Sequence, residues 1–193
     1  QISNTVYKSY VNDKNEKGWT ALMLACRNSN IYSSLDTVKI LLECGADVNL
    51  QTNDGYSALM MSSRVSKTES SLDIIKLLLK YECNVNLQDV DGWTALMLSC
   101  LNTNTESNIE TVELLLKNKS NVNLQNCDGF TALMLASRTS SIDSSLDTVK
   151  MLLKFNCNVN LQCVDGWTAL MLASRYSNTH SSLDTVKLLL EFN

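Results

Sequence analysis

The sequence predicts an all-helical solenoid, in which helix–turn–helix units stack on one another and are joined by hairpin-like fingers. The first observation is a segment, Asp-Gly-Trp-Thr-Ala-Leu-Met at 91–97, whose near-copies return every 37 residues along the 193-residue chain. The second is an apolar pattern at helical spacing behind each copy. Periods of 20 to 50 residues are typical of solenoids. The glycines that mark the period are Gly18, Gly55, Gly92, Gly129 and Gly166.

The period divides the chain into units. Val11 and Asn12 stand before Gly18 as Val85 and Asn86 stand before Gly92, so the N-terminal flank ends in the tail of a preceding repeat. The chain starts with Gln1 and stops inside a unit, which suggests a fragment of a longer protein. We expect a flank at 1–14, repeats at 15–51, 52–88, 89–125 and 126–162, and a truncated fifth repeat at 163–193.

Each unit is expected to contain two helices. The first runs from the N-cap Thr94 to about Asn102 and is rich in Ala, Leu and Met, which favours a short buried helix. A polar connection follows, and its sequence differs in every copy. The second helix is expected to start with a capping box, a serine followed three residues later by an acid. The five pairs are Ser33/Asp36, Ser70/Asp73, Ser107/Glu110, Ser144/Asp147 and Ser181/Asp184.

An apolar stripe on the second helix and a connection to the next repeat complete the unit. Apolar residues at 183, 186, 189 and 190 would form one helical face for packing on the neighbouring repeat. Between repeats, the segment 84–92 is extended and closes on Asp-Gly, a dipeptide favoured in tight turns. We interpret this segment as a projecting finger.

Composition excludes several classes of function. The net charge is −4 and no run of Lys or Arg exceeds two residues, which argues against a nucleic-acid partner. No segment approaches the ~20 apolar residues of a membrane span, so no membrane insertion is expected. The seven cysteines are an odd number without paired spacing, which predicts free thiols, an intracellular and cytoplasmic location, and no metal site or cofactor.

The unit resembles the ankyrin repeat over residues 11–193. The family pattern of Asp-x-x-Gly-x-Thr-Pro-Leu-His, Val-x-x-Leu-Leu and Gly-Ala-Asp-Val-Asn is met by the segments at 91–97, 38–42 and 45–49. The 37-residue period looks most like the ankyrin arrays of giant DNA viruses of amoebae. The resemblance implies a protein–protein interaction module, a scaffold or adaptor that binds a protein target through its concave surface. For a viral protein, the target would be a host protein in the host cell.

The sequence departs from the family in three ways. About four extra residues separate the two helices of each unit. The family's Pro is Ala, and its layer-bonding His is Met23, Met60, Met97, Met134 or Met171, which exchanges polar bonds for packing. The glycine after the second helix survives only as Gly45, and its equivalents Glu82, Lys119 and Asn156 would be strained in the left-handed conformation.

Two rows of side chains are candidate binding residues. An aromatic follows each turn glycine, and eight residues later comes Arg in four of five copies, which places both on one side of the first helix. Trp, Tyr and Arg are enriched at interface hot spots. The alternative is that the aromatics stack along the solenoid and the arginines cover them. The aromatics are Trp19, Tyr56, Trp93, Phe130 and Trp167, and the second row is Arg27, Arg64, Leu101, Arg138 and Arg175.

Positions that differ between copies are the candidates for specificity. They lie at the finger tips and just beyond the first helix. They include Asn53, Asp89, Val90, Asn102, Cys127, Val164 and Tyr176.

No catalytic constellation is found. The single histidine, His180, falls in a variable loop without a reproducible Cys, Ser or acid beside it, so no enzyme is predicted. Two alternatives to target binding remain. One is a structural protein that associates head to tail through uncapped ends. The other is the non-catalytic repeat region of a larger effector.

Overall fold

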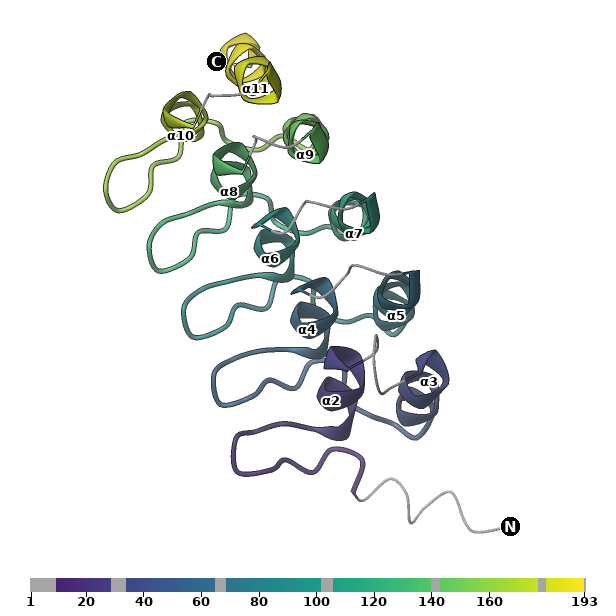
Figure 1. The fold of residues 1–193 in the computed structure, drawn as a ribbon. Helices are drawn as coiled ribbons and strands as arrows, with labels where there is room; N and C mark the ends of the chain where they lie inside the picture. Colours follow the sequence, from purple (N-terminus) through teal and green to yellow (C-terminus); the bar gives the residue numbers. More distant parts are fainter. Residues whose placement is uncertain are drawn as a thin grey trace.

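The computed structural model describes residues 10–28, 34–64, 69–101, 106–139, 143–176 and 180–192, which form a two-layered stack of helices (Figure 1). Within these ranges, each unit supplies a short inner helix and then an outer helix. The predicted all-helical solenoid is confirmed. The inner helices are α2 (Ala21–Arg27), α4 (Ala58–Arg64), α6 (Ala95–Leu101), α8 (Ala132–Arg138) and α10 (Ala169–Arg175). The outer helices are α3 (Leu35–Glu43), α5 (Glu69–Lys80), α7 (Glu106–Lys117), α9 (Asp143–Lys154) and α11 (His180–Glu191).

The inner helices begin where the sequence predicts. The Thr94 hydroxyl oxygen accepts a hydrogen bond from the Met97 amide at 3.2 Å, and Thr20, Thr131 and Thr168 cap α2, α8 and α10 in the same way. A seven-residue helix is too short to persist alone. In α6 every residue from Ala95 to Cys100 is buried, so packing against the neighbouring units stabilises the helix.

The methionine row forms the centre of the stack. Met23, Met60, Met97 and Met134 are each 1% exposed, packed between successive inner helices. Met171 in the fifth copy is 49% exposed, because no sixth unit follows it among the described residues. Burial of this thioether therefore depends on a neighbouring unit, which is how a solenoid couples the stability of one repeat to the next.

The outer helices begin differently from the predicted capping boxes. In the first copy the N-cap is Ser34, whose hydroxyl accepts from the Thr37 amide at 3.2 Å, and Ser33 lies outside the described residues. In the later copies the helix begins one residue before the predicted cap, at Glu69, Glu106, Asp143 and His180. The prediction that Ser70, Ser107, Ser144 and Ser181 are N-caps is wrong, because those serines already have helical backbone.

Left-handed residues end the outer helices. Gly45 has φ of 91°, and Glu82, Lys119 and Asn156 keep positive φ values of 56°, 67° and 58° without the freedom of glycine. The sequence comparison between copies predicted this strain. Each non-glycine residue in this conformation costs on the order of 1 kcal/mol, least for Asn.

The fingers project from the inner layer on the side away from the outer helices (Figure 1). In the third finger the Gly92 amide donates to the Asp89 carbonyl at 2.9 Å and the Asp89 amide donates to the Trp93 carbonyl at 3.0 Å. The next finger stacks on it, because the Cys127 amide donates to the Asp91 carbonyl at 2.8 Å. A Cβ on Gly92 would lie 2.8 Å from the Cα of Asn126. Glycine is therefore required both by the φ of 79° and by the close approach of fingers.

Two ladders of amide side chains join the bases of the fingers. The Asn49 side-chain oxygen accepts from the Asn84 amide of the next unit at 2.7 Å, and the contact recurs from Asn86 to Asn121 and from Asn123 to Asn158. The Gln88 side-chain nitrogen donates to the carbonyls of Gly92 at 2.7 Å and Gln125 at 3.1 Å. Sequence analysis assigned no role to these residues. The same Asn and Gln recur at 37-residue intervals, and this recurrence was the sequence signal for a contact between repeats.

Candidate functional site

One continuous strip runs along the inner helices beside the fingers. We call it the aromatic–arginine strip, and all five of its aromatic rings are half-buried. Three arginines lie over the ring of their own copy, with the Arg Cζ 5.1 Å from the Trp19 and Trp167 ring centroids and 5.8 Å from that of Phe130. The strip consists of Trp19, Tyr56, Trp93, Phe130 and Trp167 with Arg27, Arg64, Leu101, Arg138 and Arg175.

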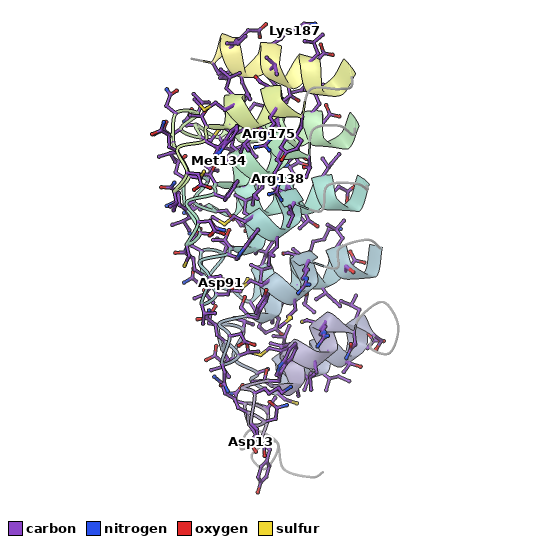
Figure 2. The ribbon with its side chains drawn as sticks, turned by 60° about the vertical axis from the view of Figure 1, so that its left-hand side comes forward. Asp13, Asp91, Met134, Arg138, Arg175 and Lys187 are labelled. Carbon is purple, nitrogen blue, oxygen red and sulfur yellow. The ribbon has the colours of Figure 1, made fainter. Side chains whose placement is uncertain are left out.

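The strip shows the contacts expected of a structural role and also leaves its arginines exposed, and its role in binding stays a prediction. The rings are partly packed against the core, and arginines cover three of them, as the structural interpretation required. The four arginine side chains are nevertheless exposed, and Leu101 is half-buried. Figure 2 shows Arg138 and Arg175 one above the other on successive inner helices, with Asp91 at the edge formed by the fingers.

A pocket opens between the first two copies of the strip. It has a volume of about 410 Å³ and is lined by residues of two inner helices and of the first two fingers. The rings of Trp19 and Tyr56 supply apolar wall, Arg27 and Arg64 supply cations, and Asp54 of the finger supplies a carboxylate. Such a mixture of apolar surface and a few convergent polar groups is characteristic of binding sites. Asp54 was not among the predicted site residues, although it immediately precedes the turn glycine Gly55.

The finger tips contain exposed and buried positions side by side. Val90 is 63% exposed and Val164 is 76% exposed, and Cys127 and Asn53 are exposed as well. The Asn53 side-chain nitrogen donates to the Glu16 carbonyl of the preceding finger at 2.9 Å. These four residues are accessible to a partner, and their role in binding stays a prediction.

Asp89 differs from the other finger-tip candidates because it is buried. Its carboxylate accepts from the Trp93 amide at 2.7 Å and the Asp91 amide at 3.1 Å, so it closes the turn of its own finger. Burial raises the pKa of the Asp89 carboxyl, while the amides of Trp93 and Asp91 favour the charged form and oppose the shift. Burial also raises the pKa of Tyr56, with the Asp89 carboxylate as the next cause. These contacts favour a structural role for Asp89.

The positions beyond the inner helices are only partly described. Tyr176 is exposed and lies 5.7 Å from Arg175, measured from the ring centroid to the Cζ atom. Thr139 is half-buried, and its hydroxyl donates to the Leu135 carbonyl at 3.1 Å. Asn102 lies outside the described residues.

The single histidine and the seven cysteines belong to different elements of the fold. His180 is the first residue of α11, so its backbone is helical and the prediction that it lies in a loop is wrong. All seven cysteines are free, and burial raises the pKa of Cys26 to about 12 and of Cys83 and Cys157 to about 11. Those thiols stay protonated and behave as small apolar groups. Among the described residues no group of three or more His, Cys, Asp or Glu could hold a metal ion.

A family model for ankyrin repeats, three copies long, matches residues 3–89, 30–126, 64–144 and 103–193. The chain belongs to the ankyrin-repeat family. Ankyrin repeats are in general protein-binding units, so the match agrees with the mixed apolar and charged character of the aromatic–arginine strip.

Similar sequences occur in a giant virus. Three ankyrin repeat proteins of Acanthamoeba polyphaga mimivirus match short stretches of this ankyrin array. One is 51% identical over 43 residues, which is 22% of this chain and 7% of the viral protein. The others are 54% identical over 43 and 44 residues, which is 22% and 23% of this chain and 8% of each viral protein. The matched stretches thus span less than a tenth of these relatives.

No helix within the described ranges is long and apolar enough to cross a membrane.

Proposed function

We propose that this ankyrin array is a non-enzymatic scaffold or adaptor that binds a protein target on its concave surface, formed by the fingers and the inner helices. The observation that carries the proposal is the aromatic–arginine strip, because it is continuous and its arginines are exposed. Aromatic and arginine side chains anchor protein interfaces when their surroundings exclude water. The giant-virus relatives make a host protein of an amoeba the expected target.

Site-specific photocrosslinking tests this proposal. A photoreactive amino acid is placed at the exposed Val90 of a finger, and in a matched protein at the exposed Ile40 of the outer helix α3. Both proteins are irradiated in an Acanthamoeba lysate. We expect a discrete adduct from position 90 that is weakened by Arg138→Gln, and none from position 40. Adducts from position 40 alone would place the binding surface on the outer helices instead.

Self-association is a second candidate, favoured by the exposure of apolar side chains on the last unit. Met171, Leu183 and Leu190 are each about half exposed, whereas Met134 in the interior is buried. A second copy that stacked on this unit would cover them. Light scattering after size-exclusion chromatography separates the candidates, since head-to-tail association predicts a mass that grows with concentration and Met171→Lys would abolish that growth.

A further inference from the structure

The four arginines of the strip differ from four lysines of the outer helices, Lys76, Lys117, Lys150 and Lys187, in how their charge is balanced. In the part of the chain that the structure describes, every ion pair joins a lysine of an outer helix to a carboxylate one turn earlier on the same helix. No arginine takes part in one. Arg27, Arg64, Arg138 and Arg175 are exposed and therefore keep donors for an anion from outside the chain.

Stacking on the rings prepares three of these arginines, Arg27, Arg138 and Arg175, for a carboxylate. The Arg27 and Arg175 Cζ atoms lie 5.1 Å from tryptophan ring centroids, a distance at which the ring attracts the cation. A guanidinium held over a ring loses conformational freedom before a ligand arrives, and its five N–H donors lie around its edge. Carboxylates and phosphates bind that edge through two parallel hydrogen bonds. The strip is thus a row of partly ordered anion receptors.

The finger carboxylates restrict which anion fits. Asp54, Asp91, Asp128 and Asp165 are exposed on the fingers, and Asp54 lines the same pocket as Arg27 and Arg64. A uniform polyanion such as a nucleic acid would place negative charges against the finger aspartates as well as against the arginines. Its contact with the aspartates would be repulsive. The partner must therefore be acidic toward the inner helices and neutral or basic toward the fingers. A peptide can meet this condition because its sequence can place acidic side chains toward the inner helices and neutral or basic side chains toward the fingers.

Repeat spacing sets the spacing of the acids. Packed helices lie about 8–10 Å apart. A polyproline II chain advances about 3.1 Å per residue and has three residues per turn, so every third side chain faces the same way. Three residues of such a chain therefore span one repeat. The third copy has the half-buried Leu101 where the others have arginine, so the central position of the segment meets an apolar side chain.

We infer that the aromatic–arginine strip binds an acidic peptide segment of its protein target in polyproline II conformation, with a carboxylate at every third residue and an apolar residue at the centre. This inference rests on the proposed function and adds the chemistry of the partner. It assigns Arg27 and Arg64 to the acids on one side of the apolar residue, and Arg138 and Arg175 to those on the other.

The test uses synthetic peptides and fluorescence anisotropy. The first peptide has Glu at every third position except the central one, which is Leu, with Ser and Gly between. A second has Lys in place of Glu, a third has the same composition with all Glu clustered at one end, and a fourth is helical with Glu at heptad spacing. We expect the first peptide to bind at least about tenfold more tightly than each of the others. Equal binding of the lysine, clustered or heptad peptide would overturn the inference.

Matched variants locate the peptide on the strip. Arg64→Glu and Arg138→Glu should each weaken binding of the first peptide by about tenfold or more, whereas Lys39→Glu makes the same charge change on the outer helix α3 and should leave it unchanged. Leu101→Arg restores the residue of the other copies and should improve binding of a peptide with Glu at its centre. An equal loss from Lys39→Glu would show that only net charge matters. Circular dichroism checks folding, and Arg138→Gln replaces Arg138→Glu if that variant unfolds.

The two proposals fail separately. A crosslinked adduct at position 90 without binding of the first peptide would retain a protein-binding concave surface and reject the acidic segment. Absence of both would reject the concave surface itself.

Discussion

The inner and outer helices present two rows of cations that repeat with the same period but make different contacts. On the outer helices Lys76, Lys150 and Lys187 each lie 3.0–3.2 Å from an aspartate one turn earlier. On the inner helices three of the four arginines lie over aromatic rings, and none of the four makes an ion pair among the described residues. The comparison shows that repetition alone does not mark a binding site. What distinguishes the inner row is the aromatic ring that lies under three of its four arginines.

The largest expected effect concerns the framework that holds both faces. Gly92→Ala should lower the free energy of unfolding by about 3 kcal/mol, because it adds strain at positive φ and a clash with the next finger. Gly166→Ala is the matched control, since Gly166 has nearly the same φ of 78° but nothing within 4 Å of its added Cβ. That variant should lose only about 1 kcal/mol. Equal losses in urea titrations would show that finger stacking contributes little.

Trp93→Ala tests whether the strip is structural as well as exposed. The ring is half-buried and packs against the core, so we expect a loss of about 2 kcal/mol, less than for a fully buried large-to-small change. Binding of the target should weaken also. Urea titration and crosslinking yield of the same variant measure both effects. A loss of stability with full binding would assign Trp93 to the stack alone.

Charge removal should separate the two cation rows. Arg138→Gln and Lys150→Gln each remove one exposed charge, and each should change the free energy of unfolding by no more than about 1 kcal/mol. Only Arg138→Gln should weaken target binding. Thermal melts and crosslinking yields provide the comparison, and a larger binding defect for Lys150→Gln would reverse the assignment of faces.

The smallest effect is expected at Asp89. Burial raises its pKa in the folded state, so the folded state holds the proton more strongly and stability falls as pH rises from the unfolded pKa through the folded one. Asp89→Asn removes this pH dependence. The asparagine keeps a side-chain oxygen that can accept from the Trp93 amide, as the Asn126 side-chain oxygen accepts from the Phe130 amide in the next finger. The variant should be slightly more stable than the parent at neutral pH, and the difference should disappear at acidic pH. Melting temperatures of both proteins from acidic to neutral pH check this expectation. A parent protein that gained stability with rising pH, relative to the variant, would contradict it.

The sequence was sufficient for the architecture because each element recurs with the same local rules. Threonine caps, apolar inner helices and the left-handed residues at 82, 119 and 156 all follow from the comparison of copies. The outer-helix starts did not follow, because inserted residues outside the repeat pattern continue the helix backwards. Local propensity gave no warning of that extension.

The candidate site was less predictable because burial depends on contacts between units. Asp89 looked like an exposed variable residue. In the structure, however, the side-chain oxygen at this position accepts a hydrogen bond from the backbone amide four residues later. This holds for Thr52, Asp89 and Asn126. Variation in residue type there conceals a constant hydrogen bond. The unpaired state of the arginines could not be read from sequence either, since it depends on which carboxylates lie within reach in the stack.

The most direct test of the central claim combines stability and binding in one protein. Arg27, Arg64, Arg138 and Arg175 are all changed to Gln, and the matched protein carries Lys76→Gln, Lys150→Gln and Lys187→Gln. Urea unfolding and photocrosslinking from position 90 are then measured for both. We predict that the arginine variant unfolds within about 1–2 kcal/mol of the parent and loses its adduct, while the lysine variant keeps both properties. An arginine variant that loses several kcal/mol of stability, or that still forms the adduct, would contradict the assignment of this row to binding.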